Sequence, residues 1–116
     1  MSTNQIGEIK VPMTNAGLFP QAFGKAEFEI ENNGEREFEV EVEDIPVGSY
    51  DLVVDGVQRG SIMVQAEHDG NEGEIEFSNF NDDDELPFDF DPRGQLIEVF
   101  NGSEQVFSID FPTTEG

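Results

Sequence analysis

Residues 26–31 and 37–43 place an apolar side chain at every second position and a glutamate at each position between. Successive side chains of a β-strand point to opposite faces, so this period of two predicts two strands with one buried face and one acidic face. A helix would spread the same glutamates around its circumference and would leave no continuous apolar stripe. The alternation therefore restricts this part of the chain to a half-buried β-sheet.

Turn signals built from glycine, proline, asparagine and aspartate recur at strand-length intervals along the chain. They delimit predicted strands at 22–31, 36–43, 49–54, 60–66, 73–78, 86–90, 95–100 and 104–111, with a further short strand near 6–11. A length of 116 residues suits one domain. We therefore predict a single domain over residues 1–116, an all-β antiparallel β-sandwich, Ig-like or prealbumin-like, of seven to nine strands.

Directly opposed residues of a hairpin lie on the same face, and this parity predicts the register around the Asn33-Gly34 turn. A three-residue loop over 32–34, with Gly34 in a left-handed bulge position, opposes Phe28 to Phe38 and keeps both faces consistent. The outward pairs are then Glu31 with Glu35, Glu29 with Glu37, Glu27 with Glu39, and Lys25 with Glu41. Like charges opposed across a sheet cost roughly 0.2–1 kcal/mol per pair, so this glutamate ladder calls for an explanation.

Two later hairpins follow from the same parity argument. The Asp55-Gly56 turn mixes the two faces if its loop has only two residues. We therefore predict a bulge at Arg59-Gly60, which sets Tyr50 against Ile62. The Asn101-Gly102 turn needs no correction. Its predicted pairs are Ile97 with Val106, and Leu96 with Phe107.

The chain carries 27 acidic residues against five basic ones, a formal net charge of −22. Such a surface repels phosphate backbones and anionic lipids, which argues against nucleic-acid and membrane-surface roles. No run approaches the roughly 18 apolar residues of a membrane span, so we expect no membrane insertion. No cysteine is present, which excludes disulfides and thiolate metal sites.

Three explanations of the acidic residues remain open at this point. They form a solvated, solubilising face, or they reflect a high-salt habitat, which the low lysine content also fits. Alternatively they bind divalent cations, because hard cations such as Ca²⁺ prefer oxygen ligands. Acids spread over all surfaces would indicate salt adaptation, whereas several oxygens converging on one point would indicate binding. The expected partners are cations or a basic protein surface.

A discrete ion site is expected in the loops rather than on the strand face. The first candidate metal site draws on an acidic loop and the strand after it: Asn79, Asn81, Asp82, Asp83, Asp84, Asp89 and Asp91. The second candidate lies around the Asp69-Gly70 turn: Glu67, Asp69, Asn71 and Glu72, with Glu74 nearby. Neither matches the EF-hand spacing. Each is therefore a general acidic loop, and the alternative interpretation is a solvated hairpin connection.

Enzyme chemistry has little support in the sequence. His68 is the only histidine, and it lies in a predicted turn among charged residues. No GxSxG elbow and no phosphate-binding glycine loop is present. Carboxylate pairs are too abundant here to indicate a glycosidase. We therefore expect a non-enzymatic protein whose only cofactor is Ca²⁺.

Residues 45–56, IPVGSYDLVVDG, resemble the P-x-G-x-Y-x-L-x-V segment of bacterial extracellular prealbumin-like and carboxypeptidase-regulatory-like domains. In those domains the tyrosine and leucine point into the core, so the resemblance implies the same for Tyr50 and Leu52. It also implies a non-catalytic accessory or stalk module of a larger surface protein. The resemblance covers these residues only.

The leading prediction is a non-enzymatic structural or binding module with a strongly acidic, Ca²⁺-responsive surface, in an exported or cell-surface system. The expected location is extracellular or periplasmic, although residues 1–12 lack the basic start and apolar stretch of a signal peptide. Two alternatives stay open. One is a small enzyme or enzyme subunit acting on an uncharged or cationic substrate. The other is a cytoplasmic halophilic protein whose acidity is salt adaptation.

Overall fold

The computed structural model describes residues 5–80 and 85–113, which form β-strands and turns. The strands are β1 (Gln5–Pro12), β2 (Thr14–Asn15), β3 (Phe23–Glu31), β4 (Arg36–Glu43), β5 (Gly48–Val54), β6 (Val57–Glu67), β7 (Gly70–Ser78), β8 (Leu86–Pro87), β9 (Leu96–Asn101) and β10 (Glu104–Asp110). Among the described residues there is no helix that is long and apolar enough to cross a membrane. The prediction of an all-β fold is confirmed.

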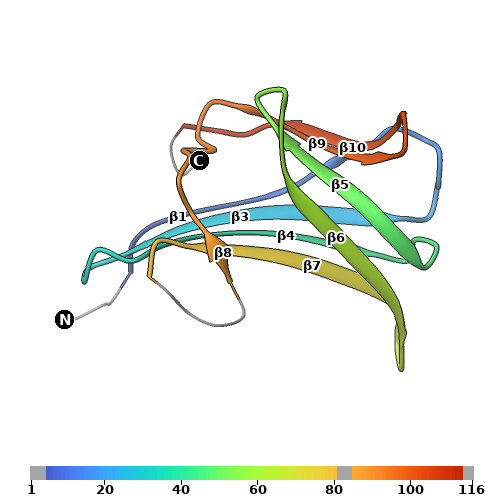
Figure 1. Ribbon diagram of the computed structural model, residues 1–116, viewed down its shortest axis with the longest axis horizontal. Helices are drawn as coiled ribbons and strands as arrows, with labels where there is room; N and C mark the ends of the chain where they lie inside the picture. The colour runs from blue at the N-terminus through green and yellow to red at the C-terminus, as the bar shows by residue number, and fades with distance from the viewer. Residues whose placement is uncertain (1–4, 81–84, 114–116) are drawn as a thin grey trace.

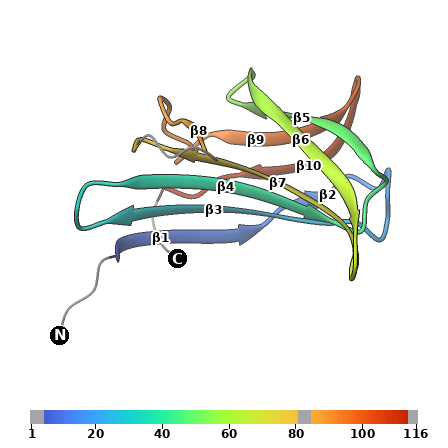
Figure 2. The ribbon, with the colours of Figure 1, turned by 60° about the horizontal axis from the view of Figure 1, so that its bottom comes forward.

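The strands follow one hydrogen-bonded path in the order β1-β3-β4-β7-β6-β5-β9-β10-β2, with β8 beside β7. All pairings along this path are antiparallel, as predicted, and only β8 runs parallel to its partner. In Figure 1, β1, β3, β4 and β7 form one layer, β5, β9 and β10 form the other, and β6 crosses obliquely between them. Figure 2 shows the same two layers from a second direction.

The N-terminal segment connects the two layers. β1 pairs with β3, whereas β2, only two residues further along, pairs with β10. Between them the buried Met13 donates its backbone N–H to the Gly24 carbonyl at 2.8 Å. The sheet is therefore nearly closed on itself. β2 was not among the predicted strands, because two residues are too few to show an alternation.

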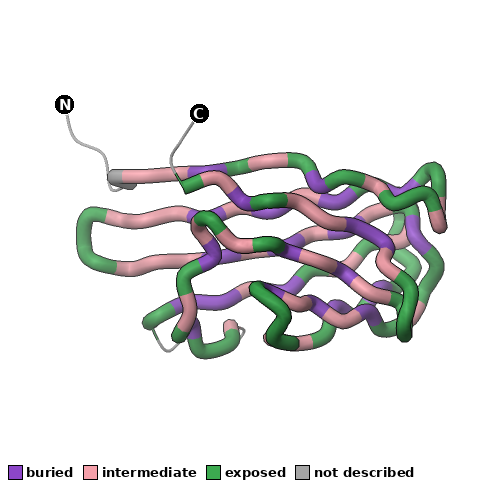
Figure 3. Tube along the Cα trace, turned by 90° about the horizontal axis from the view of Figure 1, so that it is seen from above, coloured by how far each residue is buried: buried purple, intermediate pink, exposed green. Residues whose placement is uncertain are grey.

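The β3–β4 hairpin has the predicted register. Phe28 pairs with Phe38, and Lys25 pairs with Glu41. Gly34 closes the three-residue loop at φ +93°, the left-handed conformation that glycine adopts without steric cost. Phe38, Val40 and Val42 are fully buried, so the apolar half of the alternation forms core. Figure 3 shows this alternation as short buried stretches repeating along the strands.

The β5–β6 hairpin also confirms its prediction. Tyr50 pairs with Ile62, and the register shifts between Leu52 and Val53 so that Arg59 is the extra residue of a bulge. Tyr50 and Leu52 are buried, as the resemblance implied, and the Tyr50 hydroxyl donates to the Pro46 carbonyl at 2.7 Å.

The register predicted for the β9–β10 hairpin is wrong. Ile97 pairs with Ile109, not with Val106, and Leu96 pairs with Asp110, not with Phe107. The cause is a register shift between Gln105 and Phe107. Val106 and Phe107 are adjacent, and both are fully buried. A regular strand would turn one of them outward, and the bulge allows both to face the core.

The predicted strand 86–90 is shorter than expected, because β8 ends at Pro87. Phe88 instead enters the core, and its ring stacks on the Phe38 ring at a centroid distance of 6.2 Å. Phe90 follows, with its ring centroid 5.1 Å from that of Phe77. Phe28, Phe38, Phe77, Phe88, Phe90 and Phe111 form a connected ring cluster.

Three arginines lie on rings of this cluster. The guanidinium carbon of Arg36 is 5.5 Å from the Phe88 ring centroid, that of Arg59 is 4.5 Å from Phe90, and that of Arg93 is 5.0 Å from Phe28. Contacts of this kind between a cation and a ring face are attractive. The arginines thus cover aromatic core side chains.

Candidate functional site

Strand pairing sets the outward glutamates of β1, β3, β4 and β7 in rows across the sheet. The rows are Glu8–Glu29–Glu37–Ser78, Lys10–Glu27–Glu39–Glu76, Pro12–Lys25–Glu41–Glu74 and Phe23–Glu43–Glu72–Gln65. We name the glutamates of these four rows the acidic face. The ladder predicted for one hairpin is therefore wider than expected, because β7 adds a third column of glutamates beside β4.

Carboxylate oxygens converge in trios along this face. In each trio one oxygen from every residue lies within 4.8 Å of the other two. The trios are Glu8, Glu27 and Glu29; Glu35, Glu37 and Glu85; Glu39, Glu74 and Glu76; and Glu41, Glu43 and Glu72. Oxygens bound to one Ca²⁺ at 2.3–2.6 Å lie at most about 5 Å apart. The spacing of each trio thus fits a shared divalent cation.

Close packing of carboxyl groups changes their acidity. A hydrogen bond with Glu74, burial and the charges of neighbouring glutamates raise the pKa of Glu39 to about 8. Burial, a hydrogen bond with Glu8 and the charge of Glu29 raise the pKa of Glu27. Burial also raises the pKa of Glu37, although its hydrogen bond with Glu85 acts in the opposite direction. Glu27, Glu37 and Glu39 therefore hold protons more tightly than isolated glutamates do.

Lys25 compensates part of this charge. Lys25 Nζ lies 3.1 Å from Glu41 Oε1, the ion pair expected from the hairpin register. The hydrogen bond with Glu41 and its charge raise the pKa of Lys25, so the ammonium stays charged at neutral pH. The pair is partly exposed, and ion pairs of that kind contribute little to stability.

The first predicted metal site is not assembled by its described residues. Asn79 is a structural clip, because its Oδ1 accepts from the Arg36 backbone N–H at 2.7 Å and its Nδ2 donates to the Gly34 carbonyl at 3.1 Å. Asp91 accepts two hydrogen bonds from the Arg93 guanidinium, at 2.9 and 2.8 Å. Asp89 lies 3.7 Å from Arg59. Asn81, Asp82, Asp83 and Asp84 lie outside the described residues.

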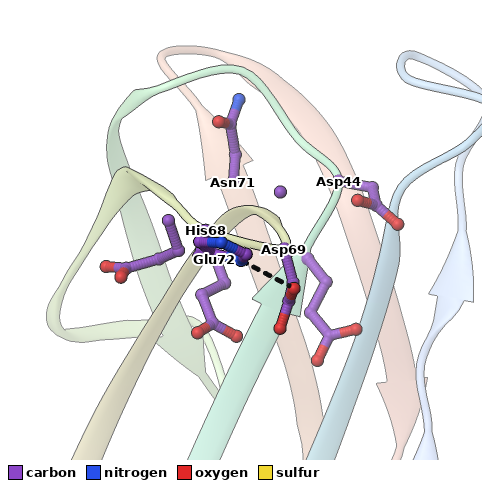
Figure 4. Close-up of a pocket in the computed structure, with 8 residues that line it drawn as sticks. Asp44, His68, Asp69, Asn71 and Glu72 are labelled. Atoms are coloured by element: carbon purple, nitrogen blue, oxygen red, sulfur yellow. Dashed lines mark hydrogen bonds and ion pairs between the residues drawn. The ribbon is translucent and has the colours of Figure 1, made fainter.

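The second predicted site is gathered in part. Glu67, Asp69, Asn71 and Glu72 all line a hollow of about 340 Å³, together with Glu43, Asp44, His68 and Gly70. The Asn71 amide donates to the Ile45 carbonyl at 3.0 Å, which holds it in a backbone contact. In Figure 4, the side chains of Asn71 and Glu72 point in opposite directions. Of the four residues of this second site, all of them described, only Glu72 belongs to a carboxylate trio.

A second hollow lies beside the first on the acidic face. It has a volume of about 260 Å³, and it shares Glu67 and Glu72 with the first hollow. Glu41 and Glu74 also line it. Two of the four trios thus lie on strands, where β4 and β7 run side by side. The sequence reveals the glutamates of each strand. It does not reveal which strands lie side by side, and the trios depend on that pairing.

His68 lies at the tip of the β6–β7 hairpin and is fully exposed. Its Nδ1 is 3.3 Å from Asp69 Oδ1, and Figure 4 marks this contact with a dashed line. The placement agrees with a surface histidine.

The outward positions of the opposite layer are much less acidic. β5 carries Ser49, Asp51 and Val53 there, and β9 and β10 add Leu96, Glu98, Phe100, Glu104, Gln105, Ser108 and Asp110. Most of the strand-borne acid therefore lies on one side of the molecule. No protein-family model and no curated protein matches the chain.

Proposed function

We propose that this chain is a non-enzymatic binding module that uses its acidic face to take up divalent cations, Ca²⁺ first among them. The observation that carries the proposal is the set of glutamate trios, whose oxygens lie within 4.8 Å of one another; three of the four trios lie entirely on paired strands. A trio of this size offers oxygen ligands at the spacing that Ca²⁺ uses. A bound cation also removes the repulsion that the ladder otherwise imposes on the sheet.

The uneven distribution of acids supports binding over salt adaptation. A protein adapted to high salt needs carboxylates over its whole surface, whereas the outward glutamates of this chain concentrate on β3, β4 and β7. We further propose a two-layered β-sandwich of the prealbumin-like kind in an exported or cell-surface protein. Support for this part comes from the two facing layers and from the buried Tyr50 and Leu52 of the 45–56 segment.

A thermal melt in three solutions tests the cation proposal. The solutions contain a chelator, calcium, or sodium chloride at the ionic strength of the calcium solution. Exposed sites of this type bind with dissociation constants of about a millimolar. Calcium at ten times that value stabilises the folded state by about 1.4 kcal/mol, which raises the melting temperature by roughly 5 °C.

Two charge-matched variants locate the effect. The double substitution Glu72→Gln and Glu74→Gln removes ligands of two trios on β7. The control, Glu98→Gln and Glu104→Gln, removes the same charge from β9 and β10. We expect the calcium-specific rise to shrink in the first variant and to persist in the second. Equal rises with calcium and with sodium chloride would leave only screening and would reject the proposal.

A further inference from the structure

A cleft opens where β6 separates from β7. From Val57 to Val64 β6 pairs with β5, and its pairing with β7 covers only Gln65–Glu67. At the far end of β7, the residues Phe77 and Ser78 pair instead with β8. The space between the first half of β6 and β8 is a cleft of about 240 Å³. It is lined by Gln58, Arg59, Phe77, Leu86, Pro87, Asp89 and Phe90.

The β6 bulge places the positively charged side chain of Arg59 at this cleft. Arg59 is the extra residue between Gln58 and Gly60, and bulges redirect side chains in this way. Its guanidinium lies over the Phe90 ring, and only 28% of the side chain is exposed. An arginine has five N–H donors in a planar fork that matches a carboxylate.

The donors of Arg59 are incompletely used. Its Nε is buried, and it has no hydrogen-bond partner among the described residues. The neighbouring Asp89 is 79% exposed, and its Oδ1 is 3.7 Å from Arg59 Nη1, beyond hydrogen-bond distance. Arg93 shows the contrast, since Asp91 holds its guanidinium by two short hydrogen bonds. Arg59 thus lines the cleft with a guanidinium that no described carboxylate holds at hydrogen-bond distance, and a second carboxylate would satisfy its free donors.

Apart from Gln58, the remaining residues that line the cleft are apolar. Leu86 is 41% exposed, an unusual amount for a leucine beside a core ring cluster, and Pro87 and Phe90 continue the same surface. A volume of about 240 Å³ equals roughly eight water molecules at ~30 Å³ each. The cleft therefore suits a small molecule with a short apolar part rather than a long chain.

We propose that this cleft binds a small organic monocarboxylate, with the Arg59 guanidinium on the carboxylate and Leu86 and Phe90 against the apolar group. The carboxylate of Asp89 competes with the ligand for Arg59. The site is separate from the acidic face. The test of this proposal therefore does not depend on whether the acidic face binds cations.

Nuclear magnetic resonance of the full chain tests the proposal. Benzoate is titrated into ¹⁵N-labelled protein, with benzyl alcohol as the uncharged match, and the Arg59 Nε–H signal is followed. We expect benzoate to shift this signal and to bind at least about tenfold more tightly than benzyl alcohol, because only the carboxylate satisfies the guanidinium. Arg59→Gln should weaken benzoate binding by about tenfold or more. Asp89→Asn should strengthen it by about threefold, since the competing charge is gone.

Arg36→Gln is the matched control, because Arg36 also lies over a ring of the cluster but does not line the cleft. It should leave benzoate affinity unchanged. Equal affinities for benzoate and benzyl alcohol would overturn the proposal. So would undiminished binding by folded Arg59→Gln, or an equal loss in Arg36→Gln. If Arg59→Gln does not fold, Arg59→Lys and Asp89→Asn decide, since the lysine keeps the charge without the fork and should bind benzoate less well.

Discussion

Replacing Glu39 by glutamine should stabilise the protein in alkaline solution and have little effect in acid. Glu39 lies in the middle of the acidic face, paired with Glu27 on one side and Glu76 on the other. Its pKa of about 8 exceeds the ordinary value of 4.5, chiefly because it shares a hydrogen bond with Glu74. The folded state therefore binds this proton more tightly than the unfolded state does.

The sign of the pH effect follows from that difference. Stability falls with rising pH wherever the folded state holds more protons than the unfolded state. For Glu39 the loss begins near pH 4.5 and is complete above about pH 8, where the carboxylate is charged in both states. Each tenfold difference in proton affinity corresponds to about 1.4 kcal/mol, and solvent screening of this partly exposed group reduces the total to about 1–2 kcal/mol. Glu39→Gln removes this penalty and keeps a donor for Glu74.

Urea unfolding with a chelator present, at pH 5 and at pH 9, measures the effect. Glu39→Gln should exceed the wild type by about 1–2 kcal/mol at pH 9 and by much less at pH 5. Glu104→Gln is the control, since Glu104 lies exposed at the β9–β10 turn and carries the same charge. If the two variants gain equally at pH 9, general relief of the net charge explains the result and the local carboxyl pair does not.

Two further substitutions test the packing around the site. Gly73→Ala should destabilise the fold by about 1–3 kcal/mol in urea unfolding, because a Cβ there would lie 2.4 Å from the Met63 carbonyl oxygen; Gly7→Ala, whose nearest neighbour is 4.0 Å away, should change stability little. Asn79→Ala should cost about 1–2 kcal/mol through the loss of its two clip hydrogen bonds. That loss of stability should be the same in calcium and in chelator. A loss seen only in calcium would instead indicate that Asn79 is a calcium ligand.

Local patterns in the sequence predicted the hairpins, and their limits explain the errors. The register of β3 and β4 follows from parity, because an acidic and an apolar face cannot be exchanged without burying glutamates. The β9–β10 register failed because Val106 and Phe107 are both apolar, so alternation gave no signal for the bulge. The stop of β8 at Pro87 was missed for a similar reason, since the ring cluster that takes up Phe88 is assembled only in three dimensions.

The candidate site shows the same division between local and long-range information. The loop acids were favoured because they are close in sequence, but Asn79 and Asp91 have structural partners. Two of the four trios combine β4 with β7, whose sequences are separated by two other strands. Closeness in sequence therefore could not predict these two trios, because a sheet brings together residues from distant strands.

The position of the three arginines on the phenylalanine cluster has a kinetic consequence. It ties Arg36, Arg59 and Arg93 to aromatic rings, while the glutamates of paired strands cover another side. The charge of the molecule is thus negative overall and also unevenly distributed over its surface. The electric field of these charges orients an approaching cationic molecule before contact, which can raise its association rate by factors of ten to a thousand. The advantage fades as salt shortens the screening length to about 8 Å, so association rates at low ionic strength should reveal the asymmetry most clearly.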